Sequence, residues 1–434
     1  MPHTRTRRRA AAAAALAAAP LALGTLLAPA AEARTGAEFV PRATFAVAGE
    51  VAEILSATPD GRTLLYTDSA TGVVGLVDIT LPAAPRQVGT VDVGGEPTSV
   101  AVTPDGRYAI AVVDTTDGAF TTPSGHLSVI DLRTRSIVRT LDLGGQPDSV
   151  AIAPDGRTAA VAVENQRDED VVVAGVEGGL PQAPGGFLAV VDLGGRPAAW
   201  TTTRVDLTGL PGASSPQDPE PEYVDVNRDG IAAVTLQENN AVALVDLRRK
   251  RVVGSFSAGT VHRTDADTAD DGAIAFDDEI TAPREPDAVQ WTPDGNLVTA
   301  DEGDLAPTGA RGWTVFSPRG RVLWTSGSSA ERALAGAGLY ADGRSDNRGA
   351  EFEGAEVARF GGTPHAFIGA ERGDAVLVYD LDDERRPRLQ QVLPTGDEPE
   401  GLLALPGRDL LVTADEGDGT ISVFERVRVR SPRS

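Results

Sequence analysis

The chain has 434 residues and contains no cysteine. This absence excludes disulfide bonds and thiol catalysis, so stability must come from packing, from closure of the fold or from bound metal. Histidine is also scarce: beyond residue 33 only His126, His262 and His365 occur, widely spaced along the chain. Because zinc sites in proteins rely on cysteine and on closely arranged histidine, zinc is not the metal expected here.

Aromatic residues make up only 5% of the chain, whereas glycine and proline are abundant, with 48 and 30 residues. This composition is typical of many short elements joined by turns. Length alone would suggest two or three domains, but that expectation does not hold for folds built from repeats.

Basic residues are fewer than acidic ones, 39 against 63, and the formal net charge is −24. A chain this acidic is repelled by nucleic acids and by anionic membrane surfaces, so no nucleic-acid partner is expected. Metal ions or basic partners are the natural counterparts of such a surface.

The N-terminus has the pattern of a targeting segment. Four arginines within residues 5–9 precede a run rich in Ala and Leu over residues 10–28, and small residues then lead to Ala33. This order is typical of a removable secretory signal (1–33), so we expect a secreted, extracellular protein. No later apolar run is long enough to span a bilayer, and the short polar tail 429–434 shows no anchor or sorting signal. Residues 34–428 are expected to form a single domain.

One short pattern recurs seven times along this domain. A stretch that alternates in hydrophobicity with period two, as a strand does, leads into a turn, most often Pro-Asp-Gly. In six copies a Gly lies eight positions after the third residue of the copy. The copies are VAEILSATPDGR (51–62), EPTSVAVTPDGR (96–107), QPDSVAIAPDGR (146–157), EPEYVDVNRDG (220–230), EPDAVQWTPDG (285–295), EFEGAEVARFGG (351–362) and EPEGLLALPGR (398–408).

Further strands follow each copy. A second strand comes directly after the turn, a third ends in signatures such as LSVIDL or VLVYDL, and a fourth is seen in stretches such as SIVRTLDL. Seven repeats of four strands predict an all-β fold, a seven-bladed β-propeller of the YVTN or WD40-like type. The last repeat lacks a fourth strand, and RATFAVAG (42–49) is predicted to supply it, so that the N-terminal strand closes the ring with the C-terminal blade. The alternative is an open sandwich of the same hairpins.

Carboxylates recur at both open ends of the repeated hairpin. In a propeller these ends share one face, where the start of the first strand lines the central channel and the end of the second lies just outside it. Acids occupy six of the seven channel positions and all seven outer positions. The channel positions are Glu53, Thr98, Asp148, Glu222, Asp287, Glu353 and Glu400, and the outer positions are Asp68, Asp114, Glu164, Glu238, Glu302, Glu371 and Glu416.

Two rings of like charge raise the pKa of their members and cost stability unless cations compensate them. Ca²⁺ is the expected divalent cation because it takes six to eight oxygen ligands in flexible geometry, and Mg²⁺ or Mn²⁺ is the alternative. Arginine is the other available counterion, and Arg344, Arg348 and Arg372 lie near the rings in the sequence. The expected metal ligands are Asp148, Glu222, Glu238, Asp287, Glu302, Glu353, Glu371, Glu400 and Glu416. The competing interpretation is that these acids merely solvate the ends of loops.

The long insertions are predicted on the same acidic face, because each follows a second or a fourth strand. The most site-like is GRSDNRGAEFEG (343–354), in which Arg344, Asp346 and Asn347, together with Arg372, are expected to bind a ligand. DVNRDG (225–230) resembles the start of a calcium loop but has Leu236 where that loop needs Glu, so we expect the ordinary turn of the repeat. The acidic run 265–279 is expected to be a flexible, solvated loop, with a metal loop as the alternative.

Four blocks of sequence carry a resemblance to a known family. EPEYVDV…VTLQENNAVALVDL (220–247), EPDAVQ…LVTADEGD (285–304), GRSDNRGAEFEG (343–354) and HAFIGAERGDAVLVYDL (365–381) resemble the choice-of-anchor I family. These are exported bacterial propeller proteins related to animal mesenchyme-specific cell-surface glycoproteins. The first three repeats are similar only to generic YVTN-type repeats, and two regions are shorter than the resemblance would imply, after residue 257 and after DEGD.

The resemblance implies an extracellular seven-bladed propeller, held in some members by varied C-terminal anchors, with phosphatase-like or phytase-like labels on some relatives. Together with the acidic rings, it leads us to expect a monomer that binds a divalent cation, with a ligand-binding or cell-surface-associated role. The expected partner is a small anionic ligand or a cell-surface component.

Two alternatives stay open. The first is a metal-dependent hydrolase of phosphoesters or lactones, with Glu222, Asp287, Glu353 and Glu400 as candidate catalytic residues and Arg344 or Arg372 receiving the anion. The second is an interaction scaffold for a basic partner. No nucleophile elbow, phosphate-cradling glycine loop or zinc-helix motif occurs in the sequence.

Overall fold

Seven four-stranded antiparallel sheets make up most of the computed structural model, which describes residues 37–168, 171–303 and 305–428. We number the sheets as blades 1 to 7. The predicted signal peptide, the tail 429–434 and Asp304 lie outside the described residues. None of the described helices is long and apolar enough to cross a membrane.

The strands of the first four blades follow the order of the chain, apart from two extra strands inside blade 3. They are β2 (Leu55–Ala57), β3 (Thr63–Asp68), β4 (Val73–Asp78) and β5 (Arg86–Asp92) in blade 1; β6 (Glu96–Val102), β7 (Tyr108–Asp114), β8 (Gly125–Asp131) and β9 (Ser136–Asp142) in blade 2; β10 (Pro147–Ile152), β11 (Thr158–Val163), β14 (Phe187–Asp192) and β15 (Thr201–Asp206) in blade 3; and β16 (Pro221–Val226), β17 (Ile231–Leu236), β18 (Ala241–Asp246) and β19 (Arg251–Ser257) in blade 4.

The last three blades include one strand from the other end of the chain. They are β22 (Pro286–Trp291), β23 (Leu297–Asp301), β24 (Gly312–Phe316) and β25 (Val322–Thr325) in blade 5; β26 (Ala355–Phe360), β27 (Thr363–Ala370), β28 (Ala375–Asp380) and β29 (Arg388–Pro394) in blade 6; and β30 (Pro399–Leu405), β31 (Leu410–Asp415), β32 (Thr420–Arg428) and β1 (Ala37–Ala46) in blade 7. Short 3-10 turns lie at η1 (Pro197–Ala199), η2 (Asp342–Arg344), η3 (Glu371–Gly373) and η4 (Pro406–Arg408).

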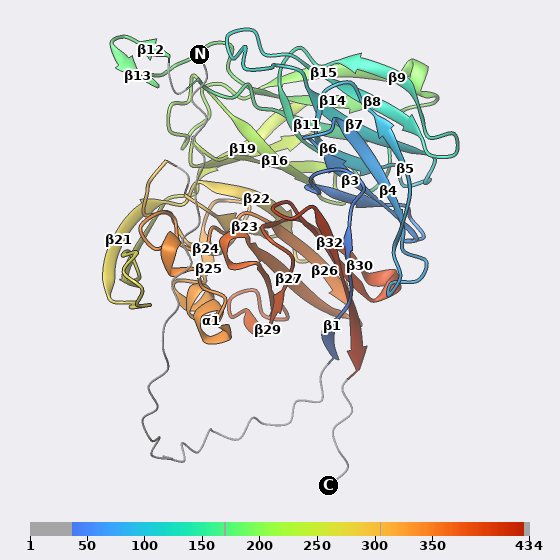
Figure 1. The fold of residues 1–434 in the computed structure, drawn as a ribbon. Coiled ribbons are helices and arrows are strands. Elements are labelled where there is room, and N and C mark those ends of the chain that lie inside the picture. The colour runs from blue at the N-terminus through green and yellow to red at the C-terminus, as the bar shows by residue number, and fades with distance from the viewer. Residues whose placement is uncertain (1–36, 169–170, 304, 429–434) are drawn as a thin grey trace, which may run out of the picture. The chain divides into compact units, whose positions relative to one another are not determined.

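The blades form a closed ring around an axis lined by their first strands. Each first strand contacts the first strands of both neighbouring blades, from β2 through β6, β10, β16, β22, β26 and β30 and back to β2. β1 pairs antiparallel with β32 and completes blade 7, which confirms the predicted closure (Figure 1). The closing strand covers Ala37–Ala46 and therefore begins earlier than the predicted stretch 42–49.

The hairpin turns use the chemistry that their sequence predicts. In blade 2, Asp105 accepts hydrogen bonds from the Thr103 hydroxyl at 2.7 Å and from the Arg107 backbone N–H at 3.1 Å. Gly106 has φ +68°, and a Cβ there would lie only 3.0 Å from Pro59 of the neighbouring turn. Both the backbone angle and the lack of space therefore favour glycine at this position. DVNRDG (225–230) is likewise the plain turn between β16 and β17, as expected.

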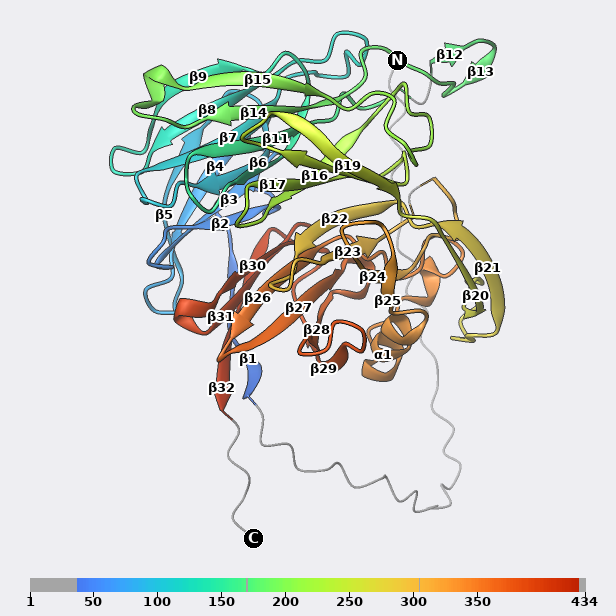
Figure 2. The ribbon, with the colours of Figure 1, turned by 180° about the vertical axis from the view of Figure 1, so that it is seen from behind.

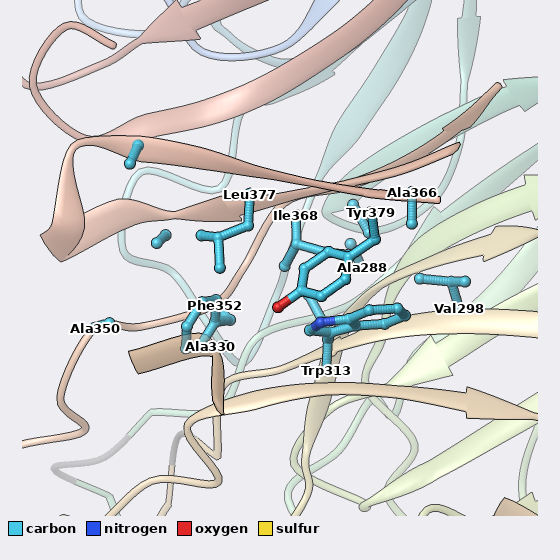
Figure 3. Packing of buried hydrophobic residues seen from close by; sticks show 14 of the residues in the cluster. Ala288, Val298, Trp313, Ala330, Ala350, Phe352, Ala366, Ile368, Leu377 and Tyr379 are labelled. Atoms are coloured by element: carbon cyan, nitrogen blue, oxygen red, sulfur yellow. The ribbon is translucent and has the colours of Figure 1, made fainter. Parts of the chain in front are cut away.

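Seven of the eight hydrophobic clusters of the described residues lie between neighbouring blades, one for each pair, and the small eighth cluster lies at the hairpin that follows blade 4. The cluster between blades 5 and 6 is built around Trp313, whose ring lies 4.7 Å from that of Tyr379 and 4.5 Å from that of Trp324. Figure 3 shows Trp313 and Tyr379 side by side at the centre of this cluster. Because each sheet buries its two faces only against its neighbours, packing of the ring depends on every blade.

The additions to the repeat lie on one side of the propeller. A small hairpin, β12 (Val172–Val173) and β13 (Val176–Glu177), follows the second strand of blade 3, and a longer one, β20 (Thr260–Ala266) and β21 (Asp278–Pro283), follows blade 4. Both hairpins project from the same side in the two views (Figures 1 and 2). The acidic run 265–279, predicted as a loop, forms the tip of this hairpin: its ends pair in β20 and β21, and residues 267–277 between them form the loop.

A buried ion-pair network fastens these additions together. Helix α1 (Ser329–Ala337), which follows blade 5, carries Glu331, whose carboxylate lies 3.8 Å from Arg311 and 4.0 Å from Arg263 of β20. Arg311 is 0% exposed and donates to the backbone carbonyls of Thr308, Asp267 and Ser345. The Arg311 guanidinium therefore contacts the hairpin β20–β21, helix α1 and the loop 342–350 and holds them together.

Candidate metal and ligand site on the channel face

Six of the seven channel positions predicted from the sequence line one cavity, and the seventh, Glu53, does not. The cavity has a volume of about 90 Å³ and lies at the end of the axis where the first strands begin. Thr98 is the one lining residue of this set that is not acidic, and its hydroxyl donates to the Pro147 carbonyl at 3.1 Å. The carboxylates that line the cavity are Asp148, Glu222, Asp287, Glu353 and Glu400.

Burial and mutual repulsion raise the pKa of these carboxyl groups. Burial raises the pKa of Asp148 well above its ordinary value, and the charge of Glu164 raises it further. Burial raises the pKa of Glu222 and Glu400 in the same way, with the charges of neighbouring acids as the next causes. For Glu53, beside the cavity, burial raises the pKa to about 7 although Ser69 donates a hydrogen bond to it. The channel is thus a place where negative charge is costly and a cation would be stabilised.

The outer positions lie at the ends of the second strands, as predicted, but they have different contacts. Asp68 and Asp114 accept hydrogen bonds of 2.7–3.0 Å from nearby backbone N–H groups, so both shape the adjoining turns. Burial, followed by the charge of Glu238, raises the pKa of Glu164 to about 8. Burial and then the charge of Glu371 raise the pKa of Glu416. Among the outer acids, Glu164 and Glu416 therefore resemble the channel acids most closely.

A third set of carboxylates, which the sequence analysis missed, lies two residues before each channel position. Five of these seven positions are Glu, mostly followed by Pro, so the repeated Glu-Pro pair was the signal that could have revealed them. Three of them, Glu285, Glu351 and Glu398, have left-handed backbone φ angles of +41° to +56°. Such angles are unfavourable for side chains other than glycine and persist only where the surrounding structure enforces them. The seven positions are Val51, Glu96, Gln146, Glu220, Glu285, Glu351 and Glu398.

Arg167, also missed by the sequence analysis, forms ion pairs with three acids between blades 3 and 4. Its guanidinium lies 2.7 Å from Glu220 and 3.3 Å from Asp218, and it also pairs with the outer residue Glu238. The Arg167 side chain is only 9% exposed. Burial, followed by Glu238, nevertheless raises the pKa of Glu220 to about 11, so one arginine does not compensate all three acids.

Three further arginines converge on Glu351, just before β26. The Glu351 side chain is 1% exposed, Arg344 pairs with its Oε1, and Arg372 Nε donates to its Oε2 at 2.8 Å. Arg348 Nε lies 3.5 Å from Glu351 Oε1, and the same guanidinium pairs with Glu302. We call Arg344, Arg348, Arg372 and Glu351 the arginine corner.

The arginine corner adjoins the channel through shared carboxylates. Arg372 also pairs with Glu398 and, at 2.9 Å, with the outer residue Glu371. Burial, followed by the hydrogen bond to Glu371, raises the pKa of Glu353 well above its ordinary value. Three carboxylates each place one oxygen within 4.8 Å of the others, close enough to hold one ion: Glu302, Glu351 and Glu353.

Two residues predicted to bind ligand are not part of this network. The side chains of Asp346 and Asn347 are exposed, and they make no hydrogen bond or ion pair to another described residue. His365, expected to be structural, is 4% exposed and stacks on Phe367, with 6.0 Å between the ring centres.

The Arg167 cluster depends on one buried amide, which allows a test of its support. Asn239 is 0% exposed, donates to the carbonyls of Ser214 and Asp218 at 2.9 Å, and accepts from the Glu220 backbone N–H at 2.9 Å. We expect Asn239→Ala to lower the free energy of unfolding by about 2 kcal/mol, because it leaves buried backbone groups unpaired. Urea unfolding measures this, with Asn347→Ala as the exposed control. Equal stabilities of the two variants would contradict it.

Comparisons with known proteins found one matching family model and similar solved structures. The family model of the choice-of-anchor I domain matches residues 53–308 and 305–384. Among solved structures, the chain is similar to Kuenenia stuttgartiensis hydrazine synthase, with 17% sequence identity, a TM-score of 0.57, and coverage of 89% of this chain and 98% of that chain. At this identity the likeness concerns the fold alone. No match was found among the curated proteins.

Proposed function

The chain belongs to the choice-of-anchor I domain family, and we propose that it binds a divalent cation, Ca²⁺ in the first place, in the acidic channel of its propeller. One observation carries the proposal: five carboxylates line a single small cavity. Among the described residues, no basic side chain forms an ion pair with Asp148, Glu222 or Glu400. We therefore expect a bound cation to balance the negative charge of these carboxylates.

The donor set favours Ca²⁺ over softer metals. The cavity offers carboxylate oxygens together with the hydroxyl groups of Thr98, Ser99 and Ser149, and the chain has no cysteine. Its volume of about 90 Å³ leaves room for an ion and several waters, because a water needs only about 10–15 Å³ by the same measure. Ca²⁺ accepts six to eight such ligands in irregular geometry, whereas Mg²⁺ demands a near-ideal octahedron.

The family membership indicates an exported or cell-surface protein. The finer proposal is that the protein is secreted, carries its cation outside the cell and has a ligand-binding or surface-associated role. Calcium sites of extracellular modules typically have dissociation constants on the order of 10⁻⁴–10⁻³ M, and an affinity in that range would suffice.

Titration of chelator-treated protein with CaCl₂ by calorimetry tests the proposal. The wild-type protein should bind Ca²⁺, and its melting temperature should rise with Ca²⁺ concentration, because a ligand that binds only the folded state stabilises it. Glu222→Gln and Glu400→Gln should each weaken binding at least about tenfold, since each removes a carboxylate that lines the cavity.

Asp155→Asn is the matched control, because it removes the same charge from an exposed turn on the opposite face, where Asp155 accepts only from the Arg157 backbone N–H. It should bind Ca²⁺ as the wild type does. The proposal fails if no heat and no shift in melting temperature appear up to millimolar Ca²⁺. It fails equally if the control loses as much affinity as the channel variants.

A further inference from the structure

The arginine corner holds more hydrogen-bond donors than its carboxylates use. The buried Glu351 carboxylate receives one guanidinium group from each of three arginines, yet the side chains of Arg344, Arg348 and Arg372 are 31%, 24% and 30% exposed. The guanidinium groups of Arg344 and Arg372 are therefore each held by a buried partner, while part of each side chain is exposed to solvent. One further donor, Arg344 Nε, is buried without a hydrogen-bond partner among the described residues.

Glu351 acts here as a positioning residue. Its two oxygens hold Arg344 and Arg348 on one side and Arg372 on the other. The loop that carries it is held in turn by Arg311, which donates to the Ser345 carbonyl. Guanidinium groups that are already oriented lose little further entropy when they bind a planar or tetrahedral oxyanion, and their paired N–H groups match its oxygens.

The net charge of the arginine corner makes oxyanion binding depend on the charge in the channel. The guanidinium groups of Arg344 and Arg372 face three carboxylates, Glu351, Glu371 and Glu398, so the formal charge of this group is −1. The acidic cavity adjoins it through Glu353. An anion approaching the metal-free protein is therefore repelled, and a divalent cation in the cavity would remove this repulsion.

We propose that Arg344 and Arg372 form a subsite for one oxyanion group of a ligand, a carboxylate, phosphate or sulfate, and that a divalent cation in the channel strengthens its binding. This inference rests on the proposed cation site for its coupling, whereas the subsite itself rests on the arginine corner. Because linkage is reciprocal, the oxyanion must tighten cation binding by the same factor.

The test is a calorimetric titration of the whole protein with three separate probes, sodium acetate, inorganic phosphate and sodium sulfate, in chelator and in Ca²⁺. We expect at least one probe to bind weakly in chelator and about tenfold more tightly with Ca²⁺, which is within the usual range of coupling between two sites. The three probes distinguish a carboxylate ligand from a phosphate or sulfate ligand.

Arg344→Gln and Arg372→Gln should each abolish or weaken this binding about tenfold. Arg388→Gln is the control, because it removes the same charge from a pair with Asp380 at the outer strand β29, where the arginine side chain is 63% exposed. Thermal melting of each variant verifies that it is folded, and using two arginine variants keeps the test decisive if one of them does not fold.

The outcomes separate the two proposals. Ca²⁺ binding without binding of any probe, or unchanged probe binding in both arginine variants, overturns the subsite and leaves the cation site standing. Probe binding that requires the arginines but occurs without any Ca²⁺ binding overturns the cation site and the coupling. Probe binding that weakens as Ca²⁺ is added overturns the coupling, because it would mean that cation and oxyanion compete.

Discussion

Replacing Arg311 by methionine should lower the free energy of unfolding by about 3–5 kcal/mol. Methionine fills a similar volume without the charge, so the loss reports the ion pair and the hydrogen bonds rather than a cavity. The variant leaves the fully buried Glu331 carboxylate with Arg263 alone, 4.0 Å away, and leaves three backbone carbonyls without their donor. Removing one partner of a buried ion pair typically costs this much. Urea unfolding monitored by circular dichroism measures it.

A double variant and a surface control complete this prediction. Arg311→Met combined with Glu331→Leu should be less destabilised than the sum of the two single variants, because the second change removes the charge that the first leaves uncompensated. Arg332→Met, on the same helix, breaks a pair with Asp265 in which both side chains are nearly half exposed. It should change the stability by less than about 1 kcal/mol. Equal losses for Arg311→Met and Arg332→Met would contradict the structural role given to Arg311.

Ca²⁺ affinity should fall about 100-fold or more when the pH is lowered from 8 to 6. Burial raises the pKa of Glu53 to about 7 and that of Glu164 to about 8, and it raises those of Asp148, Glu222 and Glu400 in the same direction. A cation bound in the cavity must displace the protons of the lining groups Asp148, Glu222 and Glu400, and each displaced proton costs about a factor of ten in affinity per pH unit below its pKa.

Calorimetric titrations at several pH values, each in two buffers of different ionisation enthalpy, measure both the affinity and the number of protons released. The control is Asp155→Asn, which should follow the wild-type profile. An affinity that stays constant between pH 6 and pH 8 would mean that the cation does not bind among the protonated carboxyl groups.

The same pKa shifts determine whether the stability of the metal-free protein rises or falls with pH. A carboxyl group whose pKa is raised in the folded state holds more protons there than in the unfolded state, so stability decreases as the pH rises. For Glu53 and Glu164 the window runs from the ordinary value of 4.5 up to about 7 and about 8. Each group contributes a loss of about 1.4 kcal/mol per pH unit within its window. Chelated protein should thus melt at a higher temperature at pH 5.5 than at pH 8, and Ca²⁺ should reverse this order.

The fold and the two predicted rings could be deduced from the sequence because the repeat fixes equivalent places. Once Glu222 and Glu238 mark the open ends of one hairpin, the equivalent positions of the aligned repeats locate Asp287 and Glu302, or Glu353 and Glu371, in other blades. The closing strand was predictable for the same reason, since the last repeat lacked one strand.

The parts that escaped prediction belong to insertions, where periodicity gives no information. Arg167 reaches the rings from a loop of irregular length, and nothing in its spacing relates it to Glu238. Arg348 was expected near the rings, but its specific partner Glu302 could not be deduced from the sequence. The hairpin β20–β21 and helix α1 were missed because they lie in insertions outside the repeat, and the contacts that connect them, such as Arg311 with Glu331, are remote in sequence. Glu351 is different: its equivalence with Glu220 and Glu398 was visible, but its role follows only from the arginines around it.

The hydrolase and the scaffold for a basic partner remain predictions, since no contact described here tests them. The channel variants and the arginine variants also provide the material for such tests, because turnover of a phosphoester or a lactone, or capture of a basic protein, can be assayed on the same samples.

The pairing of β1 with β32 also has a consequence for the order of events during biosynthesis. The ring cannot be completed until residue 428 has been synthesised, because the outermost strand of blade 7 is among the first segments of the fold to be made and its partner is the last. Throughout translation the chain therefore remains an incomplete arc whose two end blades are unsealed. A circular permutant with its termini between two other blades would close its ring at a different point of synthesis, without altering the finished fold.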